Sequence, residues 1–123
     1  KMVWVDKKLS KEHYSEHIKK PFFKGLDEFI RSGPVIAMAI EGVDVVKNVR
    51  RIVGSTAPGD ALPGTIRGDY AHHTYEYADR KGKSIANIIH ASGSDEEAKK
   101  EVSLWFEKSE IHTYKRADEH IVF

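Results

Sequence analysis

The sequence predicts an α+β fold in which helices cover one face of a small sheet. Short apolar or β-branched runs at residues 2–5, 35–40 and 85–89 are typical of strands. Segments with apolar residues three and four positions apart lie between these runs, and this spacing indicates amphipathic helices. Because helices and long loops separate the strands, the pattern favours an α+β architecture.

The first forty residues contain two predicted helices between two strands. After the strand at residues 2–5, Ser10 is expected to cap a helix that ends at Pro21. The next helix carries apolar residues at helical spacing, namely Phe22, Phe23, Leu26, Phe29 and Ile30. A Ser-Gly-Pro turn stops it before the strand at residues 35–40. We therefore expect a helix packed on a strand.

The middle of the chain is predicted to be one helix followed by a long loop. Residues 43–53 are amphipathic, and Gly54 closes this helix. Residues 54–69 contain four glycines and also Pro58 and Pro63, so we expect a loop of fixed shape. Loops of this length in compact domains usually have a function.

A single histidine stands between a predicted strand and a predicted acidic helix in the last third of the chain. His90 follows the strand at residues 85–89, and Ser94 is expected to cap the helix at residues 95–106. Glu101 lies about two helical turns after Ser94, so its carboxylate can orient the imidazole. This arrangement indicates a nucleophile, although a structural histidine at a strand end fits the segment alone equally well.

The composition limits the classes of protein to consider. With 123 residues, the chain is long enough for one core, so we expect a single domain over residues 1–123. Its 20 basic and 19 acidic residues nearly cancel, which argues against a protein that coats nucleic acid. It has no cysteine and no apolar run long enough to span a membrane, and its first residues lack the pattern of a signal peptide, so we expect none. We expect a cytoplasmic protein that does not bind a membrane.

Several residues suited to phosphate binding accompany His90. Arg50 and Arg51 end the helix at residues 43–53, Thr56 lies in the loop, and Arg67 follows on its far side. Guanidinium groups bind phosphate oxygens in pairs, and phosphoryl transfer depends mostly on positioning and charge neutralisation. The residues alone thus indicate phosphate chemistry.

Five motifs, taken in order along the chain, resemble the nucleoside diphosphate kinase family. They are Lys20-Pro21-Phe22-Phe23, Ser32-Gly33-Pro34-Val35, Pro63-Gly64-Thr65-Ile66-Arg67-Gly68-Asp69, Asn87-Ile88-Ile89-His90-Ala91-Ser92 and Ser103-Leu104-Trp105-Phe106. The resemblance covers the whole chain and is far more specific than any single motif. It implies a ferredoxin-like antiparallel sheet covered by helices.

The resemblance also implies a reaction and the residues that carry it. His90 would take the γ-phosphate of a nucleoside triphosphate and pass it to a diphosphate in a ping-pong cycle, with Glu101 and Ser92 orienting the ring. The implied nucleotide contacts are Tyr14, Arg50, Thr56 and Arg67 at the phosphates, Asn87 at the sugar, and Phe22 with Leu26 at the base. Mg²⁺ would be carried by the nucleotide, without a dedicated protein site. The family assembles as hexamers or tetramers, so a homo-oligomer is expected.

Two features depart from the family pattern. The family begins with a strand and a helix that carry a Lys-Pro-Asp motif, and this sequence contains neither. Losing a central strand would cancel most of a typical stability of about 5 to 15 kcal/mol, so we expect these residues to exist in the molecule. Residues 71–84 form a longer connection than usual. We expect a hairpin there that, with the tail at residues 114–123, contacts other subunits; a solvated insert is the alternative.

Other functions remain open at this point. One alternative is a nucleotide-binding or nucleic-acid-binding module without catalysis, and another is a relative that has lost activity and serves as an assembly subunit. Two histidine pairs, His13 with His17 and His72 with His73, are interpreted as surface residues, with metal binding as the alternative. Transfer of phosphate from a nucleotide onto His90 would distinguish the enzyme from these alternatives.

Overall fold

The computed structural model describes residues 1–122, and its sheet has two antiparallel strands. β1 (Met2–Trp4) pairs with β2 (Pro34–Ile36), and Val3 lies opposite Val35. The α+β class is confirmed. The sheet is smaller than predicted, because β2 ends at Ile36 and does not extend to residue 40.

The strand predicted at residues 85–89 is wrong. This segment has no strand pairing, and Ile88 has a φ of 51°, a left-handed conformation that a β-branched residue rarely adopts. The guanidinium group of Arg67 donates to the carbonyl oxygens of Asn87 at 3.4 Å and Ile89 at 2.6 Å. A side chain from another part of the chain thus satisfies carbonyls that a neighbouring strand would satisfy in a sheet.

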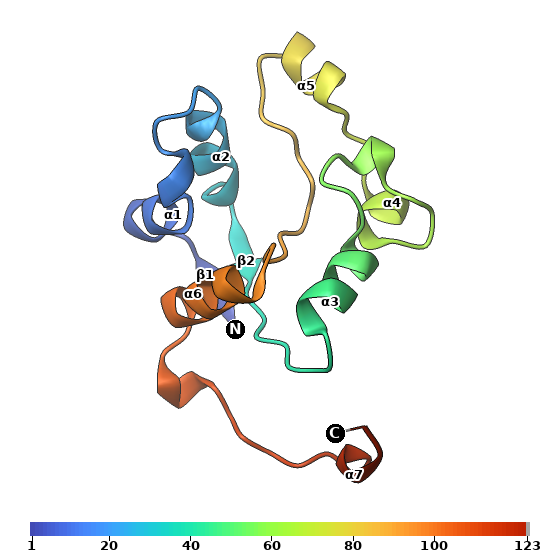
Figure 1. The fold of residues 1–123 in the computed structure, drawn as a ribbon. Coiled ribbons are helices and arrows are strands. Elements are labelled where there is room, and N and C mark those ends of the chain that lie inside the picture. Colours follow the sequence, from blue (N-terminus) through green and yellow to red (C-terminus); the bar gives the residue numbers. More distant parts are fainter. Residues whose placement is uncertain (123) are drawn as a thin grey trace.

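Three helices lie together beside the sheet (Figure 1): α1 (Lys7–His13), α2 (Phe23–Ile30) and α6 (Asp95–Trp105). The cap predicted at Ser10 is wrong. Asp6 caps α1 by accepting a hydrogen bond from the backbone N–H of Leu9 at 2.8 Å. Ser10 is fully buried inside α1 and donates to Asp27 of α2 at 2.7 Å, so its hydroxyl joins the two helices. A 3-10 helix, η1 (Ser15–His17), follows α1.

A second group of helices comes from the middle of the chain: α3 (Val45–Val53), the 3-10 helix η2 (Pro58–Asp60), α4 (Ile66–Tyr70) and α5 (Tyr75–Arg80). Gly54 closes α3 with a φ of 89°, as predicted. The stretch expected to be only loop contains η2 and α4. The hairpin expected at residues 71–84 is wrong, because Thr74 caps a short helix there.

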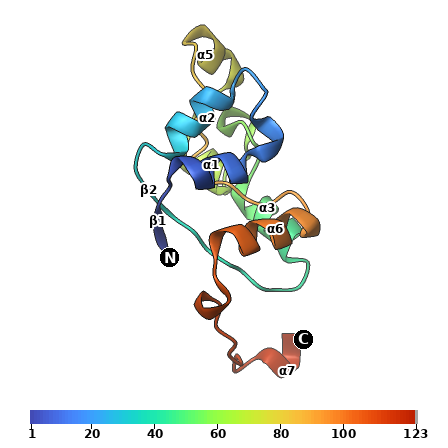
Figure 2. The ribbon, with the colours of Figure 1, turned by 90° about the vertical axis from the view of Figure 1, so that its left-hand side faces the viewer.

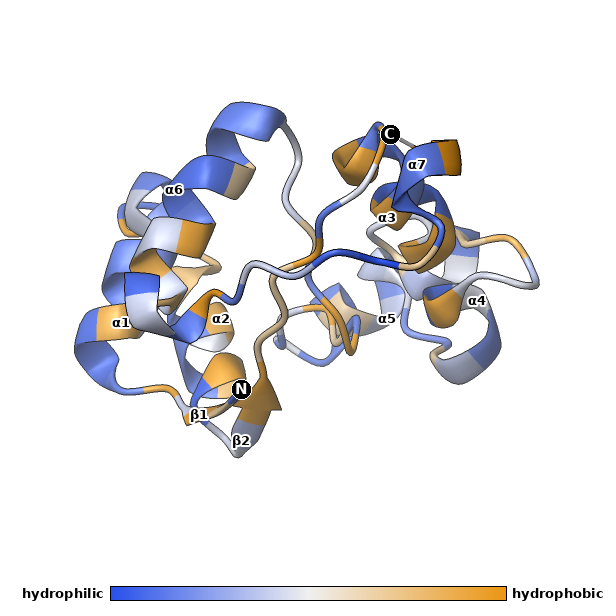
Figure 3. Ribbon diagram, turned by 90° about the horizontal axis from the view of Figure 1, so that it is seen from below, coloured by the Kyte–Doolittle hydropathy of each residue, from blue (hydrophilic) through white to orange (hydrophobic). Residues whose placement is uncertain are grey.

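The apolar interior is small and partly open. Val5 and Val53 are each only 2% exposed, whereas Trp4 and Ile36 on the sheet are 69% and 70% exposed. A cavity of about 830 Å³, lined mainly by apolar side chains of α2, β2, α3 and α6, lies between the two helix groups. Figure 3 shows these groups on either side of the molecule. His90 and Glu101 line this open cavity.

The C-terminal tail extends away from the helix groups, as Figures 1 and 2 show. It contains the 3-10 helix η3 (Lys108–Glu110) and the last helix, α7 (Glu119–Val122). Phe123, the end of the predicted subunit contact, lies outside the described residues. Among residues 1–122, no helix has the length and apolar content needed to cross a membrane.

Candidate active site

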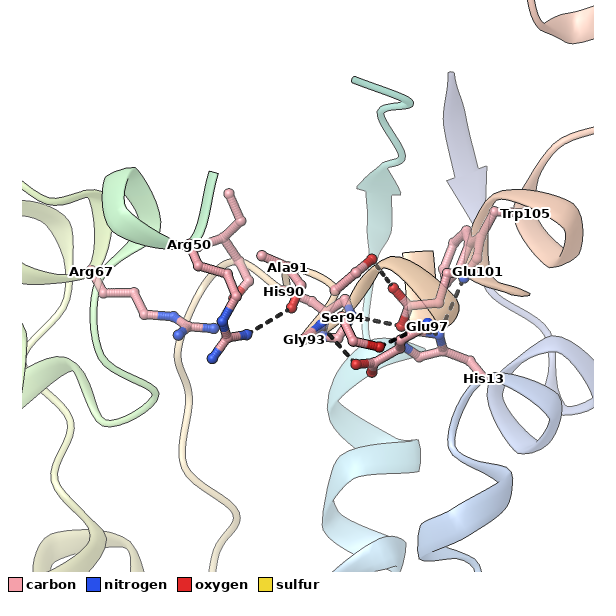
Figure 4. A network of polar contacts seen from close by, with 12 residues as sticks. His13, Arg50, Arg67, His90, Ala91, Gly93, Ser94, Glu97, Glu101 and Trp105 are labelled. Atoms are coloured by element: carbon pink, nitrogen blue, oxygen red, sulfur yellow. Dashed lines mark hydrogen bonds and ion pairs between the residues drawn. The ribbon is translucent and has the colours of Figure 1, made fainter. Parts of the chain in front are cut away.

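His90, Glu101 and Ser92 meet where α6 begins, and Figure 4 shows the first two. Ser94 caps α6 by accepting from the backbone N–H of Glu97 at 3.1 Å, which fixes the start of the helix. Glu101 then lies on the helix face that turns back toward the preceding loop. Its Oε1 is 2.7 Å from His90 Nε2, and its Oε2 accepts a hydrogen bond from the Ser92 hydroxyl. Both carboxylate oxygens are therefore held.

The charge of Glu101 fixes the tautomer of His90. Burial alone would raise the pKa of Glu101, but hydrogen bonds from His90 and Ser92 outweigh it and hold this pKa below its usual value. An ionised carboxylate accepts hydrogen bonds and cannot donate them, so His90 Nε2 carries the proton. His90 Nδ1 then carries a lone pair. The side chain is 48% exposed, which leaves this lone pair accessible to a substrate.

His13 packs directly behind His90, so its prediction as a surface histidine is wrong. Its side chain is only 3% exposed, and its ring meets that of His90 edge to face at 4.9 Å. Trp105 Nε1 donates to His13 Nδ1 at 3.2 Å. Burial first, and then the neighbouring His90, lower the pKa of His13, so its imidazole is neutral near pH 7.

Two arginines approach His90 from the other helix group (Figure 4). Arg50, at the exposed end of α3, donates to the carbonyl of Ala91 at 3.3 Å. Arg67 is buried and also donates to the carbonyl of Gly54 at 3.1 Å, in addition to its two bonds to the loop before His90. Burial, and then the charge of Arg50, lower the pKa of Arg67. The two guanidinium groups make this side of the site electropositive.

Asn87 and Thr56 also lie at this junction. The Asn87 side chain donates to the backbone carbonyl of Thr56 at 3.4 Å, which joins the loop after α3 to the segment before His90. Thr56 is exposed. At the opposite end, Glu97 accepts from the backbone N–H of Gly93 at 2.7 Å and closes the turn after Ser92. Local backbone contacts thus set the position of His90 from both sides.

A row of rings connects the start of α2 to His90. Tyr14 packs edge to face on His13 at 4.6 Å, and Tyr14 and His17 are stacked at 6.4 Å. His17 meets Phe22 edge to face at 5.6 Å, and Phe22 is 48% exposed. Tyr14 and Leu26 line the same cavity as His90, whereas Phe22 reaches this site through its ring contact with His17.

The structure brings most of the predicted site residues together around His90, Phe22 lies outside the cavity wall, and two further neighbours were not predicted. His90, Glu101 and Ser92 form one hydrogen-bonded group, while Arg50, Thr56, Arg67 and Asn87 surround the approach to it. His13 and Trp105 are the missed members. A weak signal existed for His13, since it precedes Tyr14 in a helix whose opposite face is charged.

Known proteins resemble this chain over nearly its whole length. The family model described as nucleoside diphosphate kinase matches residues 1–111. A nucleoside diphosphate kinase of Listeria innocua is 49% identical over 95% of this chain and 73% of its own, and one of Pyrococcus furiosus is 46% identical over 95% and 68%. Among solved structures, a transition state mimic of the Borrelia burgdorferi enzyme with vanadate and ADP has a TM-score of 0.92 and 40% identity, covering 99% of this chain and 76% of that one. A Halobacterium salinarum enzyme in complex with CDP has a TM-score of 0.85 and 40% identity, over 100% and 76%.

Proposed function

Because this chain belongs to the nucleoside diphosphate kinase family, we propose that His90 is the residue that carries the phosphoryl group between nucleotides. The chain is an enzyme of nucleotide metabolism that moves the γ-phosphate of a nucleoside triphosphate to a nucleoside diphosphate. The observation that supports His90 is its hydrogen bond to Glu101, since this bond directs the Nδ1 lone pair away from the carboxylate and into solvent.

The reaction then follows from the two nitrogen atoms of His90. Nδ1 attacks the γ-phosphorus, the bond from phosphorus to the β–γ bridging oxygen breaks, and the nucleoside diphosphate leaves with that electron pair. The imidazolium formed in this step is stabilised by Glu101 at Nε2. A terminal oxygen of a second diphosphate then attacks the same phosphorus, and the bond to Nδ1 breaks. Ser92 keeps Glu101 in place through both halves.

The remaining site residues are proposed to hold the nucleotide. Arg50 and Arg67 supply positive charge beside His90, with Thr56 and Tyr14 at the phosphates. Asn87 lies where a sugar hydroxyl would approach, and the exposed ring of Phe22, with Leu26 beside it, offers a face for stacking. Stacking accepts any base, because every base has a π-face.

Mg²⁺ is proposed to arrive with the nucleotide. The side chains on the electropositive side of His90 are arginines, an amide and a hydroxyl, and Mg²⁺ prefers oxygen ligands with several waters. These residues fit a metal held by phosphate oxygens rather than by a carboxylate cage. When bound, Mg²⁺ neutralises part of the phosphate charge.

A homo-oligomer, either a hexamer or a tetramer, is the proposed assembly. The apolar cavity and the exposed Trp4 and Ile36 support it, because a neighbouring subunit could cover these apolar side chains. Light scattering tests the assembly. A sequence without cysteine supports a cytoplasmic location, which cell fractionation tests.

Labelling with ATP that carries a radioactive γ-phosphate tests the role of His90. We expect an acid-labile, base-stable label on the protein, and we expect added diphosphate to remove it as triphosphate. His90→Ala should abolish the label, whereas the matched variant of an exposed histidine in the tail, His112→Ala, should retain it. A label that persists in folded His90→Ala protein would assign the nucleophile elsewhere.

A further inference from the structure

We propose that His13, His90 and Glu101 form an inhibitory binding site for a transition-metal cation such as Zn²⁺. One ligand atom of each residue lies within 4.8 Å of the other two. His90 Nε2 is 2.7 Å and His13 Nδ1 is 3.5 Å from the same carboxylate oxygen of Glu101. Ligand atoms around tetrahedral zinc are separated by about 3.3 Å, so these two separations are each within about 1 Å of that geometry.

The three side chains differ in how firmly they are held, and this difference favours metal capture. Ser92 binds Oε2 of Glu101, so Oε1 faces the two imidazoles with its lone pairs. His13 is buried and fixed. His90 is 48% exposed, so its ring can rotate to close the remaining separation from His13. An ion enters from the His90 side, where solvent supplies the fourth ligand.

The donor set selects against the cation that accompanies nucleotides. Two imidazole nitrogens and one carboxylate oxygen suit Zn²⁺ and its neighbours among the divalent transition metals. Mg²⁺ prefers oxygen ligands and keeps its waters, so it stays on the phosphates. The same active site therefore distinguishes two cations by ligand chemistry.

Occupation of this site would stop phosphoryl transfer, a consequence that rests on the proposed function of His90. To bind an ion, Nε2 of His90 must lose its proton, and the ion then takes the Nε2 lone pair. Because the ring stays neutral, a proton from solvent occupies Nδ1 instead. Nδ1 then has no lone pair with which to attack phosphorus. Glu101 is also occupied and no longer orients the ring.

Trp105 provides a signal for the ion that does not depend on activity. Its indole N–H donates to His13 Nδ1 at 3.2 Å, and a cation that takes this lone pair displaces the N–H. The fluorescence of Trp105 should therefore change on binding. The other tryptophan, Trp4, is 69% exposed on β1, so Trp4→Phe leaves Trp105 as the one reporter.

The test is a titration of nucleotide-free Trp4→Phe protein with Co²⁺, followed by competition with Zn²⁺. We expect the visible absorption of low-coordinate Co²⁺ and a change in Trp105 fluorescence, both saturating at one ion per chain. His13→Asn should weaken binding by about tenfold or more, because the asparagine oxygen keeps the bond from Trp105 but is a poor ligand for zinc. His17→Asn, on the next turn of the same region, is the matched control and should bind as before.

Two results would overturn the proposal, and both are distinct from failure of the proposed function. One is no ion binding by folded protein, and the other is equal binding by His13→Asn and the unchanged chain. In phosphotransfer assays at fixed Mg²⁺ and ATP, normalised to each variant without zinc, His13→Asn should need about tenfold more Zn²⁺ for half inhibition. A protein that is labelled by ATP but indifferent to Zn²⁺ keeps the proposed function and loses this inference.

Discussion

Both carboxylate oxygens of Glu101 have hydrogen-bond partners, whereas the two strands expose 69% of Trp4 and 70% of Ile36. The first region is assembled from α6, the turn before it and the adjacent α1, and its polar atoms hold one another. The second region has an exposed apolar surface, and Ile36 within it lines a cavity of about 830 Å³. The comparison shows that local polar contacts position the residues around His90. The apolar side chains of the strands, in contrast, are only partly covered by the rest of the chain.

Removal of the Arg67 guanidinium should cause the largest loss, because it joins the site to the second helix group. Arg67→Met keeps the length of the side chain but leaves the carbonyls of Gly54, Asn87 and Ile89 without this donor. We expect a loss of roughly 3 kcal/mol in the free energy of unfolding, measured with urea. Arg50→Met, which removes one bond at an exposed position, should cost less than about 1 kcal/mol. Equal losses in the two variants would contradict the view that Arg67 supplies the hydrogen bonds that a neighbouring strand would otherwise make.

Replacement of the carboxylate that orients His90 should reduce catalysis and also cost about 1 to 2 kcal/mol of stability at pH 7, because the pKa of Glu101 lies below its usual value in the folded chain. In Glu101→Gln the negative charge that stabilises the imidazolium is lost, so we expect kcat to fall about a hundredfold. Steady-state kinetics would measure this change. Glu97→Gln is the matched control on the preceding turn of α6, since Glu97 contacts Gly93 and not His90. A comparable drop in Glu97→Gln would show that the turn, rather than the charge, sets the rate.

The part of the site that follows from local sequence was predictable. Ser94 caps α6, and about two helical turns later Glu101 faces His90, because a helix of known start fixes the direction of each side chain. His13 could not be placed in this way. Its position beside Glu101 depends on the packing of α1 against α6, two helices far apart in the sequence.

The fold shows the same division between local and long-range causes. The amphipathic helix α3 and its closing Gly54 follow from spacing and from the conformational freedom of glycine. Residues 85–89 have a β-branched composition that is typical of a strand, yet Arg67 satisfies their carbonyls from twenty residues away. Composition alone does not reveal which donor a carbonyl will meet, so the strand prediction failed there.

The buried contact between α1 and α2, which belongs to the region with paired polar groups, allows a test with a smaller expected effect. Hydrogen bonds from Arg31 and Ser10 hold the pKa of Asp27 below its ordinary value. A lowered folded pKa contributes stability above the unfolded pKa, and this contribution is lost as pH falls through the folded value. Asp27→Asn should therefore cost about 1 to 2 kcal/mol at pH 7, with the difference shrinking below about pH 4. Urea unfolding at several pH values measures it, and a difference independent of pH would contradict the ionic origin.

The substitution with the smallest expected effect tests the exposed apolar surface of the sheet directly. Ile36→Thr replaces a side chain that is 70% exposed, so the isolated chain should lose less than about 0.5 kcal/mol. Val53→Thr is the matched change at a position that is 2% exposed, and burying its hydroxyl should cost at least about 1 kcal/mol. Urea unfolding of both variants gives the two values. If Ile36→Thr costs as much as Val53→Thr, another segment or subunit covers Ile36 in solution, because only a buried methyl group can lose that much stabilisation.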